Sequence, residues 1–430
     1  MFLATPTQRV LTVLALTGIT IFCVPETPFA QARATQCVAC HRASSDVRLS
    51  EPAMQFAETD VHRARDFSCA DCHGGDGAAT DAARAHDRGK AGFRGVPAGE
   101  AVVKTCATCH SDAERMRHYA PRQRVDQETE YATSVHGKKL AQGDRGVATC
   151  VSCHGAHGVR SVRDAKSPVY PTNVAATCAT CHASPSHMAG RRLATGSPVS
   201  TTQLADYQAS VHGAALAKGD TRGAPTCNDC HGNHGAAPPG VGAVANVCGT
   251  CHAVFAERFG TSVHKDLFEK GCAECHGNHA VAKASDDLLG STPPGVCATC
   301  HSGGDTGAHT ADAMRTGLEQ LKSAVDRSTS LIARIRNAGM EVGEQELALA
   351  EARTQLTLAR TDLHASDRAL LDPVFARGLS IVAGVDAAGQ HALDELRFRR
   401  IGLGLSLAAI LVVVVALVVK IRAIDTRHAR

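Results

Sequence analysis

Two uncharged apolar runs lie near the ends of the chain. The first extends from Val10 to Val24, follows a basic residue and precedes a small-x-small sequence, which is the pattern of a cleaved secretory signal peptide. The second, from Ile401 to Val419, holds 19 residues without a charge, which is long enough to cross hydrocarbon as a helix and longer than a typical buried core segment. The sequence therefore predicts a signal peptide over residues 1–32, a transmembrane helix over 400–420 and a short cytoplasmic tail over 421–430.

Ahead of the second run, apolar residues recur at alternating spacings of three and four, interrupted only by Ser328. These residues are Met314, Leu318, Leu321, Val325, Ile332 and Ile335, then Leu349, Ala352, Leu356, Ala359, Leu363 and Leu370. This spacing is typical of amphipathic helices, and a break at 337–343 separates two of them. Pro373 is expected to end the second helix, and a third leads towards the membrane. We therefore predict a helical hairpin, or coiled-coil-like region, over 311–399, packed on itself or on a second chain in an oligomer.

The rest of the chain lacks the composition of an ordinary globular core. Its 430 residues include no Trp, 11 Phe and 4 Tyr, whereas Cys and His number 19 and 23. Basic and acidic residues nearly cancel, 45 against 42 for a net charge of +3, so the charge gives no support to nucleic acid as a partner. Something other than large side chains must fill the interior.

Eighteen of the 19 cysteines fall into the pattern Cys-x-x-Cys-His, which occurs nine times. The cysteine pairs are Cys37 with Cys40, Cys69 with Cys72, Cys106 with Cys109, Cys150 with Cys153, Cys178 with Cys181, Cys227 with Cys230, Cys248 with Cys251, Cys272 with Cys275 and Cys297 with Cys300, followed by His41, His73, His110, His154, His182, His231, His252, His276 and His301. Two thiols at this spacing can form thioethers with the vinyl groups of a porphyrin, and the next residue places an imidazole below the iron. Zinc knuckles, redox-active thiol pairs and disulfides are the alternatives, but none requires a histidine after every second cysteine. We therefore expect nine covalently attached haem c groups, with these cysteines as attachment sites and these histidines as proximal iron ligands.

The segment that carries these sites is short for nine large cofactors. Residues 37–301 comprise 265 residues, or about 29 per site, which is too few for nine separate pockets, so the haems must pack against one another. We expect a haem-packed cytochrome c domain over 33–310 that is mostly α with little regular structure, in which loops join short helices at the Cys-x-x-Cys-His sites. Because haem c is attached outside the cytoplasm, this domain should lie on the periplasmic face of the cytoplasmic membrane, anchored by the C-terminal helix.

An internal repeat arranges the sites as one single site followed by four pairs. Three units begin at Ser134, Ser210 and Ser262 with Ser-Val-His, and a degenerate unit begins at Val61. Their remaining histidines are the candidate distal iron ligands. These are the Val-His set of His62, His136, His212 and His264, the His-Gly-x-His set of His157, His234 and His279, its displaced counterpart His86, and His118, His187 and His309, which follow a site closely.

For a lone histidine, a surface or hydrogen-bonded core position is the usual alternative, but repetition in register with the sites favours ligation. Methionine is the competing ligand, and none of the Met residues recurs in the repeat. Three further histidines, His364, His391 and His428, lie in the helical and membrane tail and are not candidates. A nearly complete set of histidine pairs predicts six-coordinate, low-potential iron and favours electron transfer over catalysis, since a filled sixth position cannot bind substrate.

These motifs resemble the multihaem c-type cytochromes with paired Cys-x-x-Cys-His sites. The rhythm of a histidine followed by Cys-x-x-Cys-His-Gly-x-His looks like that of the periplasmic decahaem cytochromes that feed outer-membrane conduits, and is also similar to the smaller class III cytochromes. The resemblance covers residues 37–301 and implies a chain of closely spaced, mostly bis-histidine haems that conducts electrons. The chain departs from the conduit pattern in having nine sites rather than ten, a helical hairpin and a C-terminal anchor.

Three functions are compatible with these features. The leading hypothesis is a membrane-anchored electron carrier, without catalytic residues, between redox partner proteins in the membrane or periplasm. The alternative is an oxidoreductase resembling the nitrite-, hydroxylamine- or tetrathionate-converting multihaem families, which needs one haem with an open sixth position. The site at 37–41 is the candidate for it, because this site lies outside the repeat. A redox sensor that acts through the hairpin is less favoured, because the inner tail is short.

Overall fold

The structure, a computed structural model, describes residues 35–239 and 244–428, so the predicted signal peptide lies outside the described residues. Within these ranges the regular elements are helices, and β-structure is limited to an isolated bridge between Arg192 and Pro198. The prediction of a mostly α chain is therefore confirmed. The chain divides into two compact units, Met1–Gln123 with Cys150–Ser161, and Arg124–Thr149 with Val162–Arg430.

The first unit is built from short helices. These are α1 (Gln36–Arg42), α2 (Val47–Thr59), η1 (Arg63–Arg65), α3 (Cys69–His73), α4 (Ala82–Ala85), α5 (Glu100–His110), α6 (Ala113–Tyr119) and α9 (Cys150–His154). A capping box of Ser68 and Asp71 starts α3 directly before its first cysteine. The helix stops at Gly74, which has φ +67° and lies so close to the carbonyl of Gly92 that a Cβ would meet its oxygen at 2.1 Å. Each Cys-x-x-Cys-His segment of this unit thus forms, or ends, a helix.

The second unit is also built from short helices. Its elements before the C-terminal helices are α7 (Gln127–Thr133), α8 (Val135–Ala141), α10 (Pro171–His182), α11 (Pro185–Met188), α12 (Gln203–Ala209), α13 (Val211–Ala217), α14 (Cys227–His231), α15 (Val244–Gly249), α16 (Ala253–Phe259), α17 (Ala273–His276), η3 (Asp286–Leu288) and η4 (Val296–Thr299). Its segments 248–252 and 297–301 continue beyond the end of α15 and of the 3₁₀ turn η4. The repeated Ser-Val-His-Gly sequence has a local cause. Ser134 and Ser210 are N-caps of α8 and α13, where each hydroxyl accepts a hydrogen bond from the backbone N–H of the glycine three residues on.

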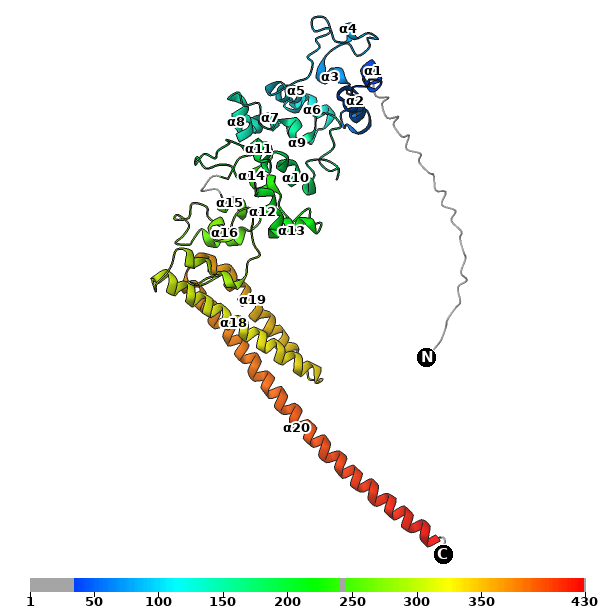
Figure 1. Ribbon diagram of the computed structural model, residues 1–430. Coiled ribbons are helices and arrows are strands. Elements are labelled where there is room, and N and C mark those ends of the chain that lie inside the picture. Colours follow the sequence, from blue (N-terminus) through cyan, green and yellow to red (C-terminus); the bar gives the residue numbers. More distant parts are fainter. Residues whose placement is uncertain (1–34, 240–243, 429–430) are drawn as a thin grey trace, which may run out of the picture. The chain divides into compact units, whose positions relative to one another are not determined.

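Three long helices at the C-terminal end of the second unit pack together (Figure 1). They are α18 (Thr306–Asn337), α19 (Gly343–Asp362) and the first half of α20 (Arg368–His428). The predicted heptad residues of α18 and α19 pack against α20 in two apolar clusters, the larger around Leu371, Phe375 and Val382 and the smaller, with Ile332, Ile335 and Leu349, around Val385. Ser328, which interrupts the heptads, is fully buried and donates a hydrogen bond to Asp386 of α20. The expected hairpin is therefore a three-helix bundle.

The helix boundaries in this bundle differ from the sequence prediction. The second helix ends at Asp362, and a 3₁₀ turn, η5 (Leu363–Ala365), and Ser366 with φ +54° connect it to α20. Pro373 lies inside α20, as its sixth residue. A proline there removes a single backbone hydrogen bond close to the helix start, and Leu371 and Phe375 around it are buried.

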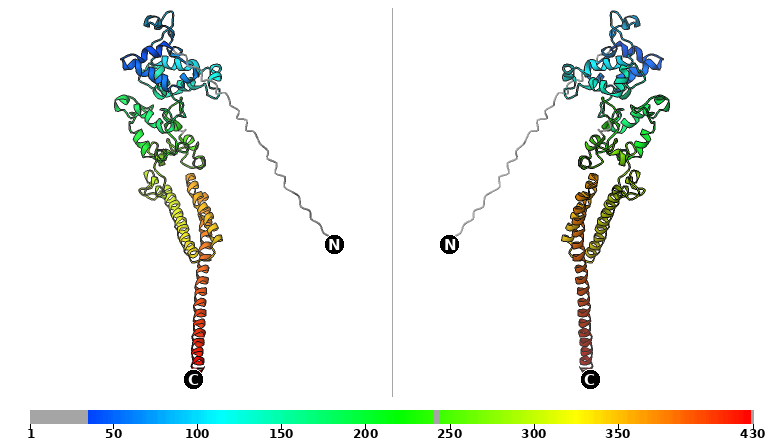
Figure 2. Two further views of the ribbon diagram at one scale, coloured as in Figure 1. Left: turned by 90° about the vertical axis from the view of Figure 1, so that its right-hand side faces the viewer. Right: turned by 90° about the vertical axis from the view of Figure 1, so that its left-hand side faces the viewer.

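The last half of α20 extends beyond α18 and α19 (Figure 2). Its large apolar side chains from Ile401 to Val419 are exposed. By length and composition, this is a helix that can cross a membrane. One continuous helix thus joins the bundle to the apolar segment.

Candidate histidine pairs

Within each of the two units, histidine rings lie opposite one another in pairs. The described ring contacts place eight of the histidines that follow a cysteine pair opposite a second histidine, with ring centroids 5.8–6.4 Å apart. The pairs, with the Cys-x-x-Cys-His residue first, are His41–His86, His73–His157, His110–His62, His182–His136, His231–His279, His252–His212, His276–His364 and His301–His264. The two histidines of each pair come from different parts of the chain, so the fold brings their rings together.

The separation of these rings fits one metal ion held between them. Metal–imidazole bonds are about 2.0–2.1 Å long, and a ring centroid lies about 1.1 Å behind its nitrogen, so two opposed ligands place their centroids about 6.3 Å apart. Two opposed imidazoles leave the equatorial positions of the ion to other ligands, as in a porphyrin. Within the described chain no group of three or more His, Cys, Asp and Glu side chains gathers as a tetrahedral zinc site requires.

The second ring nitrogen of several of these histidines has a hydrogen-bond partner. Nδ1 of His73 lies 2.8 Å from the Gly95 carbonyl oxygen, and Nδ1 of His62 lies 2.8 Å from Oδ1 of Asp60. His231, His301, His264 and His364 have similar partners, namely the carbonyl of Ala237, Asp305, Ser366 and the carbonyl of Thr361. When Nδ1 donates its proton to an oxygen, Nε2 carries the lone pair. This tautomer is the one that a metal-binding histidine needs.

Burial favours the neutral form of eight of the paired rings. It lowers the pKa of the imidazoles, since a charged ring loses its hydration in the interior. The affected residues are His41, His136, His157, His182, His212, His264, His276 and His279. Neutral imidazole is the ligand form, so these positions are prepared to bind a metal.

The first thiols of consecutive segments lie side by side within each unit. They are hydrogen-bonded in three pairs, which are Cys106 with Cys150, Cys178 with Cys227 and Cys248 with Cys272. The hydrogen bond from Cys178 lowers the pKa of Cys227 to about 7, and that from Cys248 does the same for Cys272. In these three cases, two consecutive segments of one unit therefore lie next to each other.

The second cysteine of each segment was expected to be the other thioether attachment point, and its surroundings differ from those of the first. Sγ of Cys109 lies 3.9 Å from a guanidinium nitrogen of Arg115, and Sγ of Cys181 lies 3.9 Å from the hydroxyl of Thr180. These two thiols therefore contact side chains that are close to them in the sequence. The exposed second cysteines are Cys40, Cys72, Cys230, Cys251, Cys275 and Cys300, and the half-buried ones are Cys109, Cys153 and Cys181. The described segment cysteines occur as thiols rather than as disulfides, which disfavours the disulfide alternative. Haem attachment through the segment cysteines therefore stays a prediction. This includes the second cysteines Cys40, Cys109, Cys153, Cys181 and Cys300.

The structure does not bring every predicted ligand to a Cys-x-x-Cys-His histidine. Among the described ring contacts, none joins His118, His187 or His309 to such a residue, and His118 instead packs on the ring of Tyr119. Nδ1 of His234 lies 3.6 Å from Oε2 of Glu130. The histidine opposite His276 is His364, which the sequence had assigned to the helical tail.

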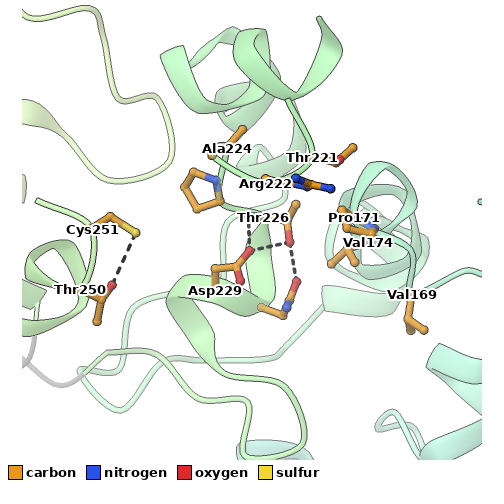
Figure 3. A pocket seen from close by; sticks show the side chains of 13 residues that line it. Val169, Pro171, Val174, Thr221, Arg222, Ala224, Thr226, Asp229, Thr250 and Cys251 are labelled. Atoms are coloured by element: carbon orange, nitrogen blue, oxygen red, sulfur yellow. Dashed lines mark hydrogen bonds between the residues drawn. The ribbon is translucent and has the colours of Figure 1, made fainter. Parts of the chain in front are cut away.

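The pocket of the second unit that Figure 3 shows is shallow and mainly neutral. It has a volume of about 290 Å³ and lies between α10, the start of α14 and the Cys251 thiol. Thr226 and Asp229 in its wall form the capping box of α14, and Arg222 lines the opposite side. Its polar side chains thus hold the segment helix in place, and they do not form an acid–base or nucleophilic group.

Comparison of the chain with protein-family models, curated proteins and solved structures finds no match.

Proposed function

We propose that this protein is a membrane-anchored nonahaem c-type cytochrome that relays electrons between redox partner proteins at the membrane and in the periplasm. The observation that carries the proposal is the set of eight histidine pairs, each with one member in a Cys-x-x-Cys-His segment and each with the spacing of two opposed metal ligands. Every such segment would hold one haem c by its two cysteines, and each haem would supply a one-electron ferric–ferrous couple.

The arrangement of the segments supports a relay in chain order. Thiols of successive segments are in contact within each unit, so successive porphyrins attached to them would lie edge to edge or face to face. At these eight sites the two imidazoles would hold the iron, which would leave no position for a substrate and keep the reorganisation on electron transfer small. The long apolar end of α20 would anchor the array at the membrane.

The enzyme alternative loses its candidate site. The segment at 37–41 was expected to hold the open haem, but the ring of His86 lies 6.0 Å from that of His41. This arrangement favours a filled sixth position there, and with it the electron carrier.

Haem content and redox stoichiometry test the proposal. The full-length protein, produced with a haem c maturation system and purified in detergent, is expected to contain nine haems per chain by pyridine haemochromogen assay and mass spectrometry. Coulometric titration should then take up nine electrons per chain. A matched double variant, Cys297→Ala with Cys300→Ala, should lose one haem and one electron. Cysteines that react with maleimide in the purified wild type, or a stoichiometric zinc content, would refute the proposal.

A further inference from the structure

Two of the His-Gly-x-His loops pair with the repeat unit before their own. The loop histidines His157 and His279 pair with His73 and His231, the first segment histidines of the preceding units. Both pairs are nearly parallel, with interplanar angles of 11° and 15°, whereas the Val-His pairs are inclined by 38–82°. The loop histidine of one unit therefore completes a site that belongs to its predecessor.

The same loops also make a backbone contact with the preceding Val-His sequence. The N–H of Val61 donates to the carbonyl of Val159 over 2.8 Å, and the N–H of Val211 donates to that of Val281 over 2.9 Å. Each acceptor lies two residues after the loop histidine. Each of these loops thus makes two contacts with the preceding repeat unit. Its histidine lies opposite a segment histidine, and the residue two positions later (the third residue of the loop) accepts a hydrogen bond from the Val-His turn.

The last unit has no successor to supply such a loop. It contains His276 as its first segment histidine and Ser262-Val263-His264 as its Val-His turn, and the chain after His301 holds no further Cys-x-x-Cys-His segment. By the rule of the repeat, His276 should lack an opposing ring.

The turn η5 and the residue after it, Ser366, contact both His276 and the Val-His turn of the last repeat unit. The ring of His364 lies 6.2 Å from that of His276 at an interplanar angle of 19°, in the nearly parallel class. Two residues on, Oγ of Ser366 lies 3.2 Å from Nδ1 of His264 and 3.3 Å from Oγ of Ser262. His364 and Ser366 thus have the spacing of a loop histidine and its third residue, and Ser366 reaches the Val-His turn through its hydroxyl where the loops use a backbone carbonyl.

The turn is held in this position by charged and aromatic contacts. Asp362, at the start of η5, has a side chain that is 3 % exposed and forms an ion pair of 2.7 Å with Arg258 of α16. Arg360 binds both carboxylate oxygens of Asp286, at 2.9 and 2.7 Å. The ring of Phe255 packs edge-on against His364. The bundle is therefore fixed to the segment-bearing part of its unit on both sides of the histidine.

We propose that His364 is the distal iron ligand at the eighth site, Cys272–His276, so that the helical bundle completes the array in place of a further repeat. The inference rests on the proposed nine-haem function. In this assignment the helical bundle supplies an iron ligand to a haem near the end of the relay. Because the bundle continues into the apolar helix, that haem would be linked directly to the membrane anchor.

Spin state of the ferric full-length protein tests this assignment. His364→Ala should retain nine haems by pyridine haemochromogen assay while one haem of the nine turns from low-spin to high-spin in the electron paramagnetic resonance spectrum, and added imidazole should restore the low-spin signal. His364→Met should keep the low-spin state and raise the potential of one haem. His391→Ala, at an exposed position of α20, is the matched control and should change nothing.

The outcomes separate the two proposals. Nine haems that all stay low-spin in His364→Ala, with no change in potential in His364→Met, would overturn the assignment of His364 and leave the nine-haem relay intact. A wild-type protein without stoichiometric haem would overturn both. An imidazole-reversible high-spin haem in His364→Ala alone would support the assignment.

Discussion

The ion pair between Arg258 and Asp362 should stabilise the turn that joins the bundle to the rest of its unit. The perturbation is Arg258→Met, which retains an unbranched chain of similar length but removes the charge. Asp362 is left with 3 % side-chain exposure and without its partner at 2.7 Å. The α16–η5 contact is therefore expected to open more often than in the wild type.

The size of the effect follows from burial and distance. Two charge centres about 4 Å apart attract by about 4 kcal/mol at an effective dielectric constant of 20, and the cost of desolvation offsets part of this. Removing one partner of a buried pair costs about 3–5 kcal/mol. The Arg258 side chain is 34 % exposed, so solvent screens the pair and we expect the lower end, about 3 kcal/mol. Asp362→Leu together with Arg258→Met should cost at most about 1 kcal/mol, since no charge is then left buried.

Hydrogen exchange measured by mass spectrometry reads this local opening directly. A loss of about 3 kcal/mol corresponds to about 150-fold faster exchange in peptides from α16 and η5, while α18 peptides at the far end of the bundle should be unchanged. The double-mutant cycle gives the coupling energy of the pair. Additive effects of the two single variants, with a coupling below about 0.5 kcal/mol, would refute the reasoning.

Five further substitutions test the packing and capping of the second unit by helical circular dichroism during urea unfolding. Leu321→Ala, at a fully buried core position, should cost about 3 kcal/mol, whereas Leu347→Ala, at a position 74 % exposed, should change stability by less than about 0.5 kcal/mol. Gly317→Ala should destabilise by about 1–2 kcal/mol because its Cβ would meet the Phe375 ring at 2.6 Å, while Gly384→Ala, with no atom within 4 Å, should stabilise by about 0.5–1 kcal/mol. Ser210→Ala should cost about 1–2 kcal/mol, since its hydroxyl caps α13 through the N–H of Gly213; an unchanged midpoint would contradict the capping account.

Sequence periodicity was a reliable guide to the C-terminal helices because it records which face is buried. The heptad residues of α18 and α19 form the core, and the interruption at Ser328 marks a polar contact with Asp386 of α20. The end of the second helix was misplaced because Pro373 is a strong local signal, whereas the true break at Asp362–Ser366 is fixed by contacts with residues far away in sequence, such as Arg258.

Ligand pairing was harder to predict because it is a property of space. The repeat gave His62, His136, His212 and His264 as a set with one role, and the structure assigns each its opposing ring. His364 was missed because it lies in a helical region without cysteines. One signal was available in the sequence, because the final unit has no His-Gly-x-His loop after it, and a histidine elsewhere was needed to complete its first site.

The spin-state spectrum of the ferric wild-type protein tests the central claim most directly. Electron paramagnetic resonance is recorded on the full-length protein at known haem content, with and without nitrite or hydroxylamine. The account predicts nine low-spin haems per chain, no high-spin signal and no change when either molecule is added. A high-spin signal that shifts on addition of nitrite or hydroxylamine would contradict it, since one haem would then have an open position and the protein would act as an oxidoreductase.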